Sequence, residues 1–147
     1  MIKFFKLKKI FIASDHAGYN LKLAIVKKFS KKLEFNDLGT NSSSKSVNYT
    51  DFAHKLCKKI LRNKSNIGIL VCGSGMGMAM AANKHKKIRA ALGYSVKNIK
   101  LSRLHNDANV ITLGGRLTSK KIAYKCINAF LNTKFEGGRH TKRVKKI

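Results

Sequence analysis

Short apolar runs alternate with longer segments of helical periodicity along this chain of 147 residues. Apolar runs that end at glycine or polar residues indicate buried strands, whereas apolar residues spaced three and four apart indicate helices. Strands are expected at Lys9–Ala13, Leu33–Leu38, Ile67–Cys72, Arg89–Leu92 and Val110–Leu113. Helices are expected at Tyr19–Leu33, Tyr49–Arg62, Gly77–Lys84, from Ser95 to about Leu104, and from a cap at Thr118 or Ser119 to about Leu131.

Five short strands that alternate with helices predict an α/β domain with a parallel sheet and helices on both faces. We interpret residues 1–147 as one domain, with a basic extension at 1–8 and a basic tail at 136–147. The polar loop Gly39–Asn48 carries no core residues and is suited to lie over a site. In such folds ligands bind at the carboxyl ends of the strands.

The most distinctive stretch is Ile67–Lys84, which reads IGILVCGSGMGMAMAANK. Its apolar run ends at Cys72, and a glycine-rich turn follows, in which backbone N–H groups can converge on an anion. A thiolate beside such groups is stabilised and can act as a base. Two plainer interpretations stay open: Cys72 as a buried strand-end residue, and Ser74 as a turn residue rather than a proton relay. The turn matches neither the dinucleotide fingerprint nor a phosphate-binding P-loop.

Other polar residues follow the expected strands or end the expected helices. Asp15 and His16 follow the first strand and Arg116 follows the fifth, although Asp15 could simply cap a helix. His105 can exchange protons near neutral pH, or can be an ordinary residue of a helix-ending loop. Arg139 and Arg143 lie four apart on one face of a tail helix, where they can clamp a phosphate or merely form a solvated basic surface.

The formal net charge of +26 first suggests a nucleic-acid-binding protein. Against that interpretation, the charge is mostly lysine, and the lysines are scattered over every expected helix. A genome biased toward A/T-rich codons produces such a composition. Nucleic-acid binding therefore remains a remote alternative as the main function, with weak nonspecific adhesion to anionic polymers expected in any case.

The three cysteines, Cys57, Cys72 and Cys126, show no paired spacing and no metal-binding cluster. An odd number of scattered cysteines favours reduced thiols in a cytoplasmic protein, with Cys57 and Cys126 as packing residues. No apolar run approaches 18 residues, and lysines interrupt the apolar N-terminus, so neither a membrane span nor a signal peptide is expected.

Taken together, five segments resemble the type B ribose-5-phosphate isomerases, a family shared with allose-6-phosphate and galactose-6-phosphate isomerases. They are SDHAG (14–18), CGSGMGMAMAANK (72–84), LSRLHNDANV (101–110), LGGR (113–116) and EGGRHTKRV (136–144). The resemblance implies a Rossmann-like three-layer sandwich and a homodimer, or a tetramer, with sites shared across the interface. It implies neither a metal nor an organic cofactor.

The resemblance further implies interconversion of D-ribose 5-phosphate and D-ribulose 5-phosphate through an enediolate, in the non-oxidative pentose phosphate pathway. A 6-phosphate aldohexose isomerase is the alternative. Some relatives carry a glutamate base where this chain has Met78, which favours a cysteine base here. By position, the implied catalytic residues are Cys72 as base, Ser74 as proton shuttle, and His105 with Asp15 for ring opening. The implied substrate ligands are Asp15, His16, Tyr49, Gly73, Ser74, Gly75, Met76, Gly77, Asn106, Arg116, Arg139 and Arg143.

Overall fold

A computed structural model describes residues 9–147, so the basic extension predicted at 1–8 lies outside the described residues. Five parallel strands form one sheet in the order β2-β1-β3-β5-β4. They are β1 (Ile10–Ser14), β2 (Phe35–Asp37), β3 (Ile67–Cys72), β4 (Ala90–Leu92) and β5 (Val110–Gly114). The predicted five-stranded parallel sheet is confirmed.

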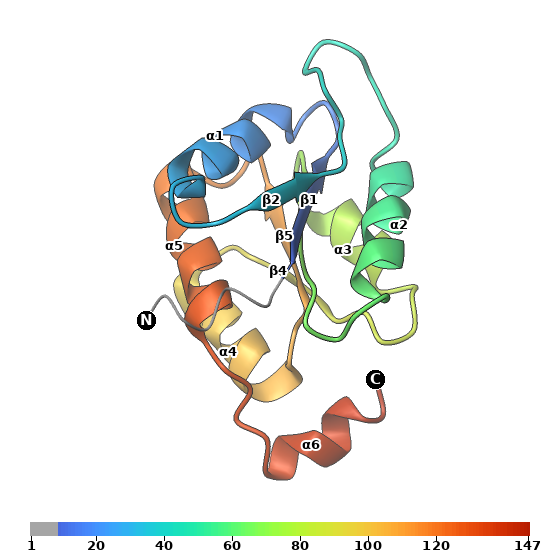
Figure 1. The fold of residues 1–147 in the computed structure, drawn as a ribbon, viewed down its shortest axis with the longest axis vertical. Helices are drawn as coiled ribbons and strands as arrows, with labels where there is room; N and C mark the ends of the chain where they lie inside the picture. Colours follow the sequence, from blue (N-terminus) through green and yellow to red (C-terminus); the bar gives the residue numbers. More distant parts are fainter. Residues whose placement is uncertain (1–8) are drawn as a thin grey trace.

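Helices cover both faces of this sheet, as Figure 1 shows. One face packs against α1 (Tyr19–Phe29), α4 (Val96–Asn106) and α5 (Lys120–Asn132). The other packs against α2 (Tyr49–Ile60) and α3 (Met76–Ala82). The short α6 (Arg139–Val144) lies beside the end of α4, at the lower end of the molecule in Figure 1. This is the three-layer sandwich expected.

The sheet has a hydrophobic core on each of its two faces, and the residues of the central strand β3 contribute to both. All six of its residues are buried. Ile69 and Val71 pack into the cluster under α1, α4 and α5, whereas Leu70 and Cys72 pack into the cluster under α2 and α3. Successive side chains of a strand point to opposite faces, so an uninterrupted apolar run can fill both layers.

Element boundaries differ from the sequence prediction at a few ends. Helix α1 ends at Phe29 rather than Leu33, and Leu33 packs against the core from the turn that follows. Of the two residues proposed to cap α5, Ser119 does so: its hydroxyl accepts from Ile122 N over 3.3 Å. Such a hydroxyl replaces the missing helical partner of a first-turn N–H group.

Lys22, inside the apolar stripe of α1, is fully buried, which the periodicity of that helix does not predict. Its ammonium group lies 2.7 Å from Asp37 Oδ1 and 2.7 Å from the Thr40 carbonyl. A buried ammonium is tolerated because its charge is paired and hydrogen-bonded. The contacts hold the start of the 39–48 loop at the carboxyl edge of the sheet, where Thr40 N also donates to Ser14 O over 2.8 Å.

The cysteines and the helices support two further expectations. All three cysteines are free and buried. Burial raises the pKa of Cys57 to about 12 and raises that of Cys126, which keeps both as packing thiols. Among residues 9–147, no helix combines the length and the apolar character needed to cross a membrane.

Candidate active site

A pocket of about 410 Å³ lies at the carboxyl edge of the sheet. It is built by the segments that follow β1, β3 and β5 together with the first residue of α2. Its lining consists of Asp15, Tyr49, Cys72, Gly73, Ser74, Gly77, Arg116 and Leu117. The strand-end residues Asp15, Cys72 and Arg116 are far apart in sequence, and the parallel sheet brings them to one place, as predicted.

Cys72 ends β3 and is 4% exposed beside this pocket. The backbone N–H of Gly75 donates to the Cys72 sulfur over 3.1 Å. The sulfur thus lies at the pocket with a backbone donor beside it, where it could serve as a base toward a bound ligand. Gly75 has φ +78°, and a Cβ there would lie 2.9 Å from the Leu113 carbonyl carbon, so this turn requires glycine.

Backbone N–H groups next to Cys72 are available to a ligand. Within the described part of the chain, no protein acceptor contacts the N–H groups of Gly73 and Ser74. The Ser74 hydroxyl accepts from Met76 N over 3.2 Å, which leaves its own proton free to donate. Unpaired N–H groups in a pocket suit an oxygen that gains negative charge during a reaction.

Arg116 is held against the glycine turn by backbone contacts. Its N–H donates to Gly73 O over 3.0 Å, and the preceding Gly115 N donates to Cys72 O over 2.7 Å. Its side chain passes over Gly73, where an added Cβ would lie 3.5 Å from Nη1. A guanidinium at this place offers forked contacts to a phosphate or carboxylate.

Tyr49 begins α2 and packs its ring against Gly77 in the first turn of α3. A Cβ on Gly77 would lie 2.6 Å from the Tyr49 ring carbon that bears the hydroxyl. Only glycine therefore allows the aromatic ring to reach this wall of the pocket. The ring, 40% exposed, gives the pocket an apolar wall with a polar tip.

Asp15 and His16, which follow β1, make different contacts. Asp15 is 5% exposed, and its Oδ1 accepts from Gly18 N over 2.9 Å. It therefore makes the local turn contact that a cap would make, and it also lines the pocket. His16 does not line the pocket; its Nδ1 accepts from Val47 N over 3.2 Å, which ties the 39–48 loop to this edge. A neutral His16 then carries its proton on Nε2.

The remaining predicted site residues lie at the other edge of the sheet. Helix α4 runs from the carboxyl end of β4 back to the amino end of β5, so its last residues, His105 and Asn106, lie far from Cys72. Arg139 and Arg143 are exposed on α6, which packs against α4. Figure 1 shows α6 at the end of the molecule opposite the loop that follows β2. One chain therefore places the predicted site residues at two opposite edges of the sheet and does not bring His105 near Asp15.

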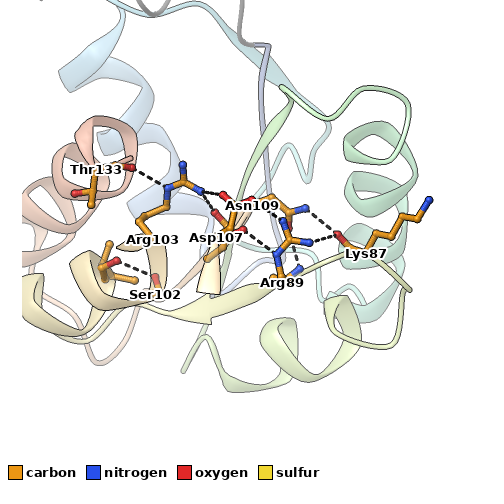
Figure 2. Close-up of polar contacts among 9 residues, drawn as sticks. Lys87, Arg89, Ser102, Arg103, Asp107, Asn109 and Thr133 are labelled. Atoms are coloured by element: carbon orange, nitrogen blue, oxygen red, sulfur yellow. Dashed lines mark hydrogen bonds and ion pairs between the residues drawn. The ribbon is translucent and has the colours of Figure 1, made fainter. Parts of the chain in front are cut away.

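A polar network fixes the carboxyl end of α4, as Figure 2 shows. Asp107, with φ +47°, ends α4 and pairs with Arg103 over 3.1 Å and with Arg89 over 3.2 Å. Arg103 is 8% exposed and also donates to Thr133 O over 3.1 Å. Asn109 accepts from Arg89 N over 2.8 Å. The network thus joins α4 to the start of β4, the start of β5 and the end of α5.

Substituting Asp107→Ala is expected to destabilise the fold by about 2 kcal/mol, since it leaves the buried Arg103 without its carboxylate. The loss of free energy of unfolding is measured by urea denaturation. Glu34→Ala removes the same charge from an exposed position with no described partner, and a change within about 0.5 kcal/mol is expected there. Equal losses in the two variants would show that the network adds nothing beyond charge.

Two features of the site escape sequence reasoning. Leu117 lines the pocket while remaining 71% exposed, and nothing in its local sequence signals that position. The Arg89–Asp107–Arg103 network was also missed, although Arg103 and Asp107 have the i, i+4 spacing of a helical ion pair. A search for that spacing at the end of the helix could have found half of the network.

This fold and pocket, with a cysteine, a glycine turn and an arginine at one sheet edge, define an α/β protein equipped to bind an anionic small molecule. The family model described as Ribose/Galactose Isomerase matches residues 10–147. The chain belongs to this family of sugar-phosphate isomerases.

Three relatives illustrate the similarity. A ribose 5-phosphate isomerase of Thermotoga maritima is 45% identical, with a TM-score of 0.90 over 94% of this chain and 95% of that one. Ribose-5-phosphate isomerase B of Mycoplasma genitalium, solved with bound ribulose-5-phosphate, is 42% identical, with a TM-score of 0.91 over 95% and 93%. Ribose-5-phosphate isomerase B of Escherichia coli is 37% identical over 96% of this chain and 95% of its own length.

Proposed function

We propose that this protein is an aldose–ketose isomerase that interconverts D-ribose 5-phosphate and D-ribulose 5-phosphate. The observation that carries the proposal is the Cys72 sulfur beside the unpaired N–H groups of the glycine turn, in a pocket that also holds Arg116. The relative from Mycoplasma genitalium, solved with the ketose phosphate, supports the choice of substrate.

The proposed reaction begins with ring opening. Asp15 and a His105 imidazole move the proton of the anomeric hydroxyl to the ring oxygen, which releases the open-chain aldehyde. The Cys72 thiolate then removes the proton from C2, and the electron pair of that bond forms the enediolate. Its oxygen is held by the N–H groups of Gly73 and Ser74. The Ser74 hydroxyl carries the proton from O2 to O1, and Cys72 returns its proton to C1.

This mechanism requires two copies of the chain. Cys72 and Asp15 lie at one edge of the sheet, whereas His105, Asn106 and the two tail arginines lie at the other. A twofold dimer places the carboxyl edge of each copy against the His105 edge of its partner. In this arrangement Arg139 and Arg143 join Arg116 around the phosphate, with Asn106 and Tyr49 near the sugar.

The proposed chemistry needs no metal and no organic cofactor, because acid–base groups and N–H donors perform each step. The free cysteines fit a reducing compartment, and we place the enzyme in the cytoplasm, in the pentose phosphate pathway. The high positive charge is expected to cause only nonspecific, salt-sensitive contacts with nucleic acid.

An isomerase assay with ribose 5-phosphate, allose 6-phosphate and galactose 6-phosphate in parallel tests the proposal. We expect ribose 5-phosphate to give the highest kcat/KM, with typical enzyme values of about 10⁴ M⁻¹s⁻¹ or more. A preference for a hexose phosphate would reassign the substrate within the family. No turnover of any of the three would overturn the proposed function.

A further inference from the structure

His140, on α6, contacts the end of α4, which carries His105. It is the one buried residue of α6, at 5% exposed. Its ring stacks on the His105 ring, with centroids 4.2 Å apart and planes inclined by 13°. Nearby, Glu136 N donates to Leu104 O over 3.0 Å, which holds the segment before α6 against the end of α4. The stack is therefore a direct side-chain contact between the buried residue of α6 and His105, beside the 3.9 Å approach of Glu136 Oε2 to His105 Nε2.

The same residues bring metal-ligating atoms together, but the geometry argues against a metal site. Ligand atoms of His105, Glu136 and His140 all lie within 4.8 Å of one another. The lone pair of an imidazole nitrogen lies in the ring plane, and zinc binds it at about 2.0–2.1 Å. Two stacked and nearly parallel rings have no common point in both planes at that distance. The two imidazole rings therefore stack face to face, and their nitrogen lone pairs do not converge on one metal position.

The stack on His105 involves the ring face of His140 rather than a hydrogen bond from its Nε2 atom. Its Nε2 is buried and has no hydrogen-bond partner among the described residues. Removal from water lowers the pKa of His140, and the adjacent His105 and Arg139 lower it further. The carboxylate of Glu136 acts in the opposite direction and raises the pKa of His140. The lowered pKa favours the neutral form of His140, which presents its ring face to His105.

We propose that His140 is a positioning residue, which acts through the face of its ring. It fixes the plane of the His105 imidazole for proton transfer, and it anchors α6 so that Arg139 and Arg143 face the same substrate. The inference rests on the proposed function, because it assigns His105 to ring opening. It makes one aromatic contact responsible for aligning the acid–base group with the phosphate clamp.

Three substitutions separate the ring face from the nitrogen atoms. His140→Phe keeps a flat ring, and kcat/KM is expected to stay within about threefold of wild type, with an unmoved pH profile. His140→Asn keeps a polar nitrogen without the ring, and His140→Ala keeps neither. In both, KM is expected to rise and kcat to fall, so that kcat/KM drops by about tenfold or more. His85→Ala, which breaks the separate His54–His85 pair, serves as the matched control with unchanged kinetics.

Proton NMR of the imidazole of His105 gives a readout that needs no activity. Stacked rings shift each other's resonances, so the shift should persist in His140→Phe and disappear in His140→Asn and His140→Ala. Rescue by Asn but not Phe, or wild-type kinetics in His140→Ala, would overturn the proposal. If the wild type turns over no sugar phosphate, the proposed function fails, while the NMR comparison still decides whether the stack orders His105.

Discussion

Replacing Cys72→Ala is expected to lower kcat by about 10³-fold or more, because the variant lacks the base that moves the proton between C2 and C1. The turn itself should persist, since Gly75 owes its φ of +78° to the backbone path rather than to the sulfur contact. The unpaired N–H groups of Gly73 and Ser74 and the guanidinium of Arg116 therefore remain in place. Binding of a phosphorylated substrate analogue should change little.

Stopped-flow or coupled assays give kcat, and calorimetry with a non-isomerisable analogue gives binding. Cys126→Ala is the matched control, because it removes a buried thiol that faces the other layer of the core. That variant should keep its turnover while losing some stability through the smaller side chain. Wild-type turnover in Cys72→Ala would remove this residue from the mechanism.

Mixing two inactive variants should restore activity if the site is shared between copies. In Cys72→Ala the damaged group belongs to the pocket edge, whereas in His105→Ala it belongs to the α4 edge. A mixed dimer then has one site with both defects and one site with neither. Random exchange makes half of the dimers mixed, so about a quarter of wild-type activity is expected on equal mixing.

The experiment needs subunit exchange, which mild denaturant and refolding provide. Mixing Cys72→Ala with Asp15→Ala gives the control, because both defects lie at the same edge and no intact site can form. Activity in that control, or none in the first mixture, would contradict the shared site.

The sequence predicts the sheet well because each strand is a short apolar run that ends at glycine or a polar residue. The run Ile67–Cys72 is long, apolar and ended by glycine, and it becomes the fully buried β3. Alternation with helices then specifies parallel strands, which in turn bring Asp15, Cys72 and Arg116 to one edge. Helix ends are less well predicted, as at Phe29, since the last turn is decided by packing rather than by periodicity.

The site was only partly predictable for the same physical reason. Residues that follow strands share an edge, so their meeting can be foreseen without coordinates. The contact of Tyr49 with Gly77 and the stack of His105 on His140 depend on how two helices pack, and no local spacing encodes either. The burial of Lys22 likewise depends on Asp37 and Thr40, which lie 15 and 18 residues away.

The ion pair between the buried Lys22 and the exposed Asp37 bears on how this composition should be understood. Only six acidic residues remain in a chain with 32 lysines and arginines. Four of the six make specific contacts in the structure: Asp15, Asp37, Asp107 and Glu136. The other two, Glu34 and Asp51, have no side-chain partner among the described residues. In a chain so poor in acids, most of the carboxylates thus hold a specific contact, so the loss of a negative charge is expected to matter most at those four positions.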